Sequence, residues 1–452
     1  MIQTQQEQVV SLKGPDSNIS SDGIIQDRLQ TIVLCVNIYL FGRISFSSIP
    51  RILPLMGIGN WIPSATAINE WVCKLGLKKL EMARNYTGQW IAIIDLSIDI
   101  AYKKVLAILR VPLETLGNGG SLKLADVECV ALEVRERWNG ESIQAALNEA
   151  LGEAEGLMAI IKDGGTDLEK GVGLWRNVRR AQQKRGIYVI SDISHFAANL
   201  LKEEFSQKLN FSEITGTVKG CLSKLYQSRF AFLAPPKVRT KARYMAISRL
   251  ARWFDRLRNA MGGPGRASGG SLLEELRSIV GGLGPQTYIL DRFSEMAIKL
   301  AEVMEILKNK GLNQETYGEV KRIVESLPPR SRSRIKLQRW LNQHLAIQKR
   351  LSIGQTGLVV SSDIIETLFG VYKNIVARSC KAEITRSALC IPALCGNASE
   401  AMIRSAIKTI GHKQVDDWSR SMIGQTNAMK RKCFFDGDSL EEILQKPGNT
   451  AA

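Results

Sequence analysis

The sequence predicts a mixed α/β protein, with a helical module before a strand-rich core and a long helical segment inserted in it. Three observations predict this class. Apolar runs typical of strands begin near Trp90, and the hydrophobic period is helical before that point and again at 197–354. Lys and Arg outnumber Asp and Glu by 61 to 44. At 452 residues the chain has room for two or three domains.

The N-terminal part predicts a helical module after an unstructured start. Residues 1–25 are polar and rich in Gly and Ser, and we expect a disordered lead-in. Residues 26–85 have the period of three short helices separated by turns, as in a helix-turn-helix DNA-binding domain. The third helix carries Asn69 and Lys74, which could reach base edges or phosphates. A plain three-helix packing module fits the pattern equally well.

Residues 86–196 predict the first part of the core. WIAIIDLSIDIAYKKVLAILRV predicts a strand ending at Asp95, a turn and a second strand, and VECVALEVRER predicts a third. A helix follows, then LMAIIKDGG as a fourth strand ending at Asp163, another helix, and IYVISDISHF as a fifth strand. Three sequential strands followed by helix, strand, helix and strand is the order of an RNase H-like core.

The remainder of the chain is mostly helical in period. Residues 197–354 predict a basic helical insertion subdomain beside the core, in which Trp253, Phe254 and Trp340 could stack on a base or anchor the helical packing. Residues 355–436 predict a return to the core through the helix SSDIIETLFGVYKN. The polar segment 437–452 predicts a flexible tail.

Composition restricts the partners and the compartment. The formal net charge of +17 indicates a large polyanion, although DNA, RNA, an anionic membrane and a basic protein without such a partner all stay open. The eight cysteines are scattered and form no short paired motifs, a pattern typical of reduced thiols in the cytosol. The start lacks a signal-peptide pattern and the apolar run at 31–41 is too short to cross a bilayer, so we expect an intracellular protein without a membrane partner.

Two carboxylates follow the strands expected to be neighbours. Asp95 and Asp163 each stand at the end of an apolar strand, and the first and fourth strands of an RNase H-like sheet end side by side. Two-metal phosphoryl transfer needs carboxylates that converge on two cations about 4 Å apart. Magnesium, a hard ion, prefers such oxygen ligands. The glycines at 164 and 165 would let the chain turn and leave room for phosphate and metal.

Four segments resemble the DDE transposases that carry a helical insertion, a group that includes hAT-like, Mutator-like and several bacterial insertion-sequence enzymes. They are IAIIDLS, KDGGTDLEKGV, SDISHF and SSDIIETLFGVYKN, and the resemblance covers about residues 90–380. It implies that the catalytic and metal-binding residues are Asp95, Asp163 and Glu366, holding two Mg²⁺ or Mn²⁺ ions. It also implies that Asp192 and His195 form an auxiliary element near the cleaved DNA, and that Lys373, on the helix of Glu366, is an auxiliary DNA-binding residue.

Two of these assignments have alternatives. Asp363 lies one turn before Glu366 on the same helix face, so it could be a ligand or the N-cap of that helix. His195 could be a hydrogen-bonded structural residue, because neutral imidazole fills that role at pH 7.

The resemblance implies a DNA transposase of a bacterial insertion sequence, active in the cytoplasm with the nucleoid. Its reaction would be DNA cleavage at the ends of a mobile element, followed by transfer of the freed 3′ hydroxyl to target DNA. Its partners would be double-stranded terminal repeats and target DNA, with a homodimer or larger assembly as the working form. The alternatives are a domesticated DNA-binding protein without activity and an RNase H-type nuclease or resolvase without strand transfer.

Overall fold

The computed structural model describes thirteen stretches of the chain. They are 28–59, 61–84, 86–96, 103–118, 121–154, 156–205, 223–234, 252–253, 255–257, 272–280, 287–376, 383–437 and 439–445. The expected lead-in at 1–25, Phe254 and the end of the expected tail lie outside them.

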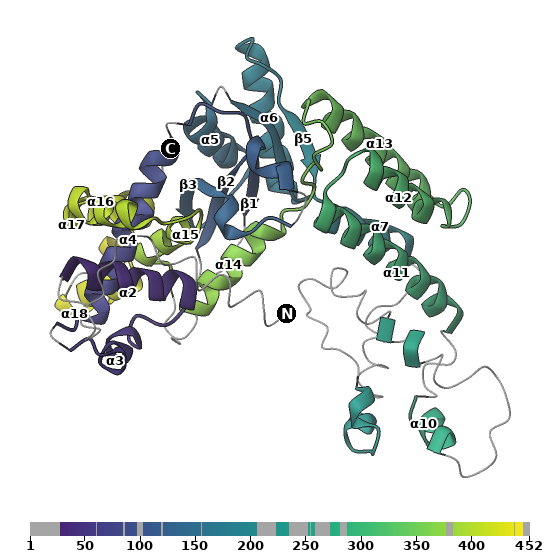
Figure 1. Ribbon diagram of the computed structural model, residues 1–452, viewed down its shortest axis with the longest axis horizontal. Coiled ribbons are helices and arrows are strands. Elements are labelled where there is room, and N and C mark those ends of the chain that lie inside the picture. The colour runs from purple at the N-terminus through teal and green to yellow at the C-terminus, as the bar shows by residue number, and fades with distance from the viewer. Residues whose placement is uncertain are drawn as a thin grey trace.

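One five-stranded mixed sheet forms the centre of the molecule, with the strand order β3-β2-β1-β4-β5 (Figure 1). The strands are β1 Trp90–Leu96, β2 Lys104–Pro112, β3 Glu128–Arg135, β4 Leu157–Lys162 and β5 Tyr188–Ser191. β1 and β3 pair antiparallel with β2, whereas β4 pairs parallel with both β1 and β5. Parallel neighbours need crossover connections, and α5 (Gly140–Leu151) and α6 (Thr166–Ala181) supply them. The strand and helix order expected from the sequence is confirmed.

The central strands are apolar on both sides because helices cover both faces of the sheet. Along β1, Trp90, Ala92 and Ile94 pack with α5 and α6, while Ile91 and Ile93 belong to the larger core on the opposite face. This alternation has the period of two that a strand imposes. Asp95 comes two residues after Ile93, so its side chain lies on the same face of the sheet as Ile91 and Ile93, which is the face of the larger core.

The N-terminal helices pack against the C-terminal ones (Figure 1). They are α2 Arg28–Gly42, α3 Ile49–Ile52 and α4 Ala65–Ala83, and their main neighbours are the 3₁₀ turn η6 Arg386–Leu389, α15 Cys390–Leu394, α16 Glu400–Thr409 and α17 His412–Met422. Lys79 of α4 donates hydrogen bonds of 3.1, 2.5 and 3.1 Å to the carbonyls of Ala393, Cys395 and Gly396. The segments expected at 26–85 and 355–436 as separate units thus share one core, and α4 lies inside it.

The described parts of the inserted segment are mostly helical. Its longer helices are α7 Ile193–Phe205, α11 Thr287–Lys310, α12 Gln314–Glu325 and α13 Arg332–Arg350, and the shorter pieces are η4 Ala231–Leu233 and α10 Leu272–Val280. None of its described residues joins the sheet, and Leu312 and Leu358 form an isolated bridge outside it.

The fifth strand is shorter than the sequence predicts. It ends at Ser191, and Asp192 caps the helix α7 that follows by accepting a 2.7 Å hydrogen bond from the backbone N–H of His195. The expected boundary at 197 therefore falls inside α7. The chain returns to the core through α14 (Asp363–Val376), and α18 (Asn427–Asp436) and α19 (Leu440–Gln445) end the described part.

Two further expectations, on membrane-spanning segments and on the cysteines, can be compared with the described residues. Each helix there is too short or too polar to span a lipid bilayer. Six cysteines fall in the described ranges, and all six are free thiols: Cys35, Cys73, Cys129, Cys390, Cys395 and Cys433.

Candidate active site

Three aspartates lie at the ends of three adjacent strands: Asp95 is the second-last residue of β1, and Asp163 and Asp192 directly follow β4 and β5. The register between β1 and β4 pairs Ile94 with Lys162, so its continuation by one residue brings Asp95 beside Asp163. The register between β4 and β5 pairs Lys162 with Ser191, and the next step brings Asp163 beside Asp192. Neighbouring strands lie about 4.8 Å apart. Asp95, Asp163 and Asp192 are therefore consecutive across the carboxyl ends of the parallel strands.

Asp163 is held by its own turn. Its Oδ1 accepts a 2.9 Å hydrogen bond from the N–H of Gly165. Gly165 has an ordinary φ of −64°, but a Cβ there would lie 3.1 Å from Asp163 Oδ1. Glycine at 165 thus provides space beside the carboxylate.

Asp192 is a buried carboxylate with four hydrogen bonds. Its Oδ1 accepts from the backbone N–H of His195 at 2.7 Å and pairs with His195 Nδ1 at 3.0 Å. Its Oδ2 accepts from the N–H and the hydroxyl of Ser362 at 2.7 and 3.1 Å. Burial opposes ionisation of Asp192, but the bonds from His195 and Ser362 outweigh it and lower the pKa of the carboxyl. Asp192 therefore joins the end of β5 to the start of α14.

His195 lies between two of the aspartates. With Nδ1 bonded to Asp192, its Nε2 lies 4.0 Å from Asp163 Oδ2. The hydrogen bond to Asp192, aided by the negative charges of Asp163 and Glu366 and opposed by burial, raises the pKa of His195 to about 9. The imidazole is thus a cation at neutral pH. The hydrogen bond of a structural histidine is present, but the ring is not the neutral imidazole considered from the sequence, and a role of His195 in DNA binding stays a prediction.

Glu366 comes from α14, which packs on the same face of the sheet as Asp95. Burial, then repulsion from Asp163 and Glu366, raises the pKa of Asp95 to about 7. Burial, then the charge of Asp363, raises the pKa of Glu366. The charges of Asp163 and Glu366 thus reach Asp95, although the three segments are far apart in the sequence.

The carboxylates of Asp95, Asp163 and Glu366 are oxygen donors of the kind that a hard cation prefers when a substrate supplies its other ligands. Within the ranges that the structure describes, no three His, Cys, Asp or Glu side chains are grouped closely enough to enclose one metal ion. Magnesium does not need such a cage, because it is commonly held by one or two carboxylates together with water and substrate phosphates. A cation between Asp95, Asp163 and Glu366 would also relieve the repulsion that raises the pKa of Asp95.

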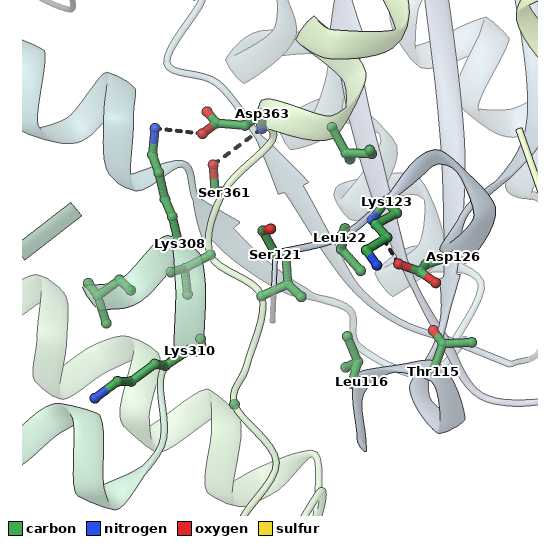
Figure 2. A pocket seen from close by; sticks show the side chains of 16 residues that line it. Thr115, Leu116, Ser121, Leu122, Lys123, Asp126, Lys308, Lys310, Ser361 and Asp363 are labelled. Carbon is green, nitrogen blue, oxygen red and sulfur yellow. Dashed lines mark hydrogen bonds and ion pairs between the residues drawn. The ribbon is translucent and has the colours of Figure 1, made fainter. Parts of the chain in front are cut away.

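Beside these residues lies a pocket of about 420 Å³ between the loop after β2, the end of α11 and the segment that leads into α14 (Figure 2). In it Lys308 of α11 forms a 2.6 Å ion pair with Asp363, and the N–H of Asp363 donates to the hydroxyl of Ser361. Asp363 is thus the first residue of α14, and its carboxylate pairs with Lys308. Its backbone N–H donates to the Ser361 hydroxyl. Lys123 lies across the pocket (Figure 2).

The other candidates from the sequence lie elsewhere. Asn69 and Lys74 are half-buried on α4, where Asn69 accepts a 3.3 Å bond from the Cys73 thiol. Five residues turn a helix by about 140°, so these two side chains leave α4 in different directions. Their joint role in base recognition stays a prediction, as does the role of Lys373, which is half-buried two turns after Glu366 on α14.

The two tryptophans of the insertion that the structure describes act as packing residues. Trp340 is only 3% exposed, and its ring stacks between Phe196 and His344 with centroid distances of 5.7 and 4.0 Å. Trp253 donates a 2.7 Å hydrogen bond to the carbonyl of Leu233. Trp340 is therefore an anchor of the helical packing and has no free face for a base.

Sequence reasoning missed two residues of this region, Ser362 and Lys308. Ser362 stands in the segment SSDIIE, where serines next to an acidic helix start were a usable signal. Lys308 gave no signal, because it is one of many lysines in a basic segment and its partner lies 55 residues further along.

Comparisons with known proteins add little to this site. No family model matches the chain, and no curated protein matches it. Among solved structures, the chain is similar to the Drosophila P element transposase strand transfer complex, at 12% identity and a TM-score of 0.43, covering 92% of this chain and 100% of that one. A TM-score this low carries no argument about function. Nothing in these comparisons points to a bacterial insertion sequence, which stays a prediction.

Proposed function

We propose that the chain is a metal-dependent DNA transposase of the DDE type, built on an RNase H-like core. The observation that carries this proposal is the placement of Asp95 and Asp163 in adjacent register positions at the ends of β1 and β4, with Glu366 of α14 close enough to affect the pKa of Asp95. The net charge of +17 suits DNA as the substrate.

Asp95, Asp163 and Glu366 would hold two Mg²⁺ or Mn²⁺ ions. Such ions, when bound, polarise the attacking and leaving oxygens of an in-line displacement. Asp192 fixes the ring of His195 and keeps it protonated, which leaves the Nε2 proton free to bond a DNA phosphate oxygen. The proposed reaction is hydrolysis of a phosphodiester at the element end, followed by attack of the freed 3′ hydroxyl on target DNA. A dimer or larger assembly would pair the two ends.

The test is a cleavage and joining assay on a supercoiled plasmid that carries the coding region with its natural flanks, with and without Mg²⁺. We expect Asp163→Asn and Glu366→Gln to abolish nicked and joined products while the Kd for DNA stays within about threefold, since carboxylates that bind metal contribute little to DNA affinity. Asp167→Asn, which changes an exposed carboxylate four residues away, is the matched control and should retain full activity.

The products separate the candidate functions. Nicks without joined strands identify a nuclease or resolvase. Sequence-specific binding without any nicks identifies a DNA-binding protein that has no activity. Cleavage by the Asp163→Asn protein at the wild-type rate would show that the reacting site is elsewhere.

A further inference from the structure

A cluster of basic residues lies at the C-terminal end of α6, the end away from Asp163. A cavity of about 300 Å³ opens where α6 ends and the chain turns into β5. Five of its eight lining residues are basic, and these are Arg176, Arg179, Arg180, Lys184 and Arg185. The cavity adjoins the amino end of β5, whereas Asp95, Asp163 and Asp192 lie at the carboxyl ends of the strands.

The ordinary reason for basic residues at a helix end does not account for this cluster. Arginines there often bond the last carbonyls of the helix. In α6 the carbonyls of Val178, Arg179 and Arg180 already accept bonds of 3.0 Å from the backbone N–H groups of residues 182–184. Gln183 makes this possible with a φ of 55°. The helix end is therefore capped by backbone alone.

Three of the arginines are exposed cations without a partner. The side chains of Arg176, Arg180 and Arg185 form no hydrogen bond or ion pair with any residue of the described ranges, and all three are exposed. Each guanidinium carries five N–H donors in a planar fork that matches two oxygens of a phosphate. The cavity thus presents unused donors of the kind that binds phosphate.

The fourth arginine is buried with its charge poorly compensated. Arg179 is 7% exposed, and its guanidinium lies 5.0 Å from the centre of the Trp175 ring. It donates one hydrogen bond, of 3.5 Å, to the carbonyl of Leu151, and its Nε has no partner in the described part. A buried cation is costly unless an anion or several hydrogen bonds compensate it. Glu153 is the acidic residue nearby, but it is 96% exposed and pairs with Lys184. The site therefore lacks an anion.

We propose that this cavity binds the phosphate backbone of double-stranded DNA at a distance from the reacting phosphate. The choice of DNA as ligand rests on the proposed function, and the need for an anion rests on the cavity itself. α6 has 16 residues and begins three residues after Asp163, so it spans about 24 Å between the carboxylates and the cavity. At 3.4 Å per base pair this corresponds to about seven base pairs of duplex.

The test compares two triple variants of the full chain. One neutralises the cavity through Arg176→Gln, Arg180→Gln and Arg185→Gln, and the control neutralises three exposed cations elsewhere through Arg137→Gln, Lys408→Gln and Lys413→Gln. The Kd for a 40-base-pair duplex (roughly 140 Å of B-form DNA) is measured over a range of salt concentrations. We expect the cavity variant alone to lower the slope of log K against log salt by about 2 to 3, since each lost phosphate contact removes about one.

Each result decides between the two proposals. If the wild-type chain binds no DNA, the proposed function and the DNA ligand of the cavity both fail. If it binds DNA and the cavity variant has the salt slope of the control, this inference fails and the proposed function stands. Thermal unfolding with inorganic tripolyphosphate forms a third arm: protection that the cavity variant loses, without a change in DNA binding, would assign the cavity to a small polyphosphate instead.

A charge-preserving variant protects the test from a folding defect. Arg176→Lys, Arg180→Lys and Arg185→Lys should keep most of the salt slope, because lysine retains the charge and loses only the planar fork. If the glutamine variant unfolds, the single variant Arg180→Gln is measured, and we expect it to lower the slope by about 1. An unchanged slope in that protein would refute the inference.

Discussion

Asp192 shows how a single residue can organise a site without belonging to its proposed metal ligands. One carboxylate oxygen is hydrogen-bonded to His195 and the other to Ser362. The Asp192 side chain thus connects the C-terminal end of β5 to the start of α14. Both oxygens of this carboxylate are buried and bonded, which leaves it no capacity for a cation. Its role in the proposed reaction is to position His195 beside Asp163.

Replacement of Asp192 by asparagine should therefore damage stability and activity together. The amide would present N–H groups to a donor, and we expect unfolding to require about 1–3 kcal/mol less free energy. Cleavage should fall by about 10- to 100-fold, as is usual when a group that orients a functional residue is lost. The measurements are urea unfolding and plasmid cleavage.

Ser362→Ala is the matched control for this change. It removes only the 3.1 Å bond from the hydroxyl and keeps the bond from the backbone N–H, so both effects should be smaller. An Asp192→Asn protein as stable and active as wild type would contradict the positioning role.

At the scale of elements, α4 is the helix on which the N- and C-terminal parts converge. Gly76 lies where α4 crosses the turn η6, and a Cβ built there would be 1.9 Å from the carbonyl oxygen of Leu389. Only glycine allows this approach, because the obstacle is backbone and cannot rotate away. α4 therefore has a structural role, because it packs closely against the C-terminal part of the chain.

Two glycine-to-alanine changes should have opposite effects on stability. Gly76→Ala should destabilise by roughly 1–3 kcal/mol or more, since α4 must move away from η6. Gly173→Ala in α6, where a Cβ meets nothing within 4 Å, should stabilise by about 0.5–1 kcal/mol through helix propensity. Urea midpoints of both proteins test this, and a stabilised Gly76→Ala protein would show that α4 and η6 are further apart.

At the scale of the whole molecule, one histidine connects the insertion to the sheet. His344 of α13 accepts a 3.0 Å bond at Nε2 from the backbone N–H of Ser191, and its Nδ1 donates to the carbonyl of Trp340 at 2.7 Å. This pattern requires a neutral ring with its proton on Nδ1. Burial lowers the pKa of His344 to about 4.

The attachment of the insertion should consequently weaken in acid. The folded pKa lies below the usual value of 6.5, so the unfolded chain takes up this proton first as the pH falls. The contribution of His344 is complete above about pH 6.5, and about 3 kcal/mol is lost as the pH falls towards 4.

His344→Gln measures this contribution, because glutamine can still accept from Ser191 and does not titrate. Unfolding free energies of both proteins from pH 7.5 to 4 should converge on the acid side, with wild type losing more. Parallel curves would contradict the neutral buried ring.

The features predicted correctly from the sequence are those that depend on the local pattern of apolar and polar residues. Asp95 and Asp163 were recognised because apolar strands end at them, and the strand order follows from alternating helices and strands. The end of β5 was misplaced because ISDISHF continues the apolar pattern, and only the bond from His195 to Asp192 shows that a helix begins there. Packing between α4 and η6 joins residues more than 300 positions apart, and no local pattern encodes it.

The two ends of the inserted segment meet. The N–H of Ile193 donates to the carbonyl of Val360 at 2.9 Å, and Leu312 and Leu358 exchange two bonds of 2.8 Å. Closing a longer or shorter segment between such ends costs little free energy. Evolution can therefore lengthen, exchange or remove this part while the contact between Asp192 and Ser362 is kept. Among related proteins, the number of residues between these two positions should vary more than any other spacing in the core, so a search motif with a fixed gap before Glu366 would overlook true relatives.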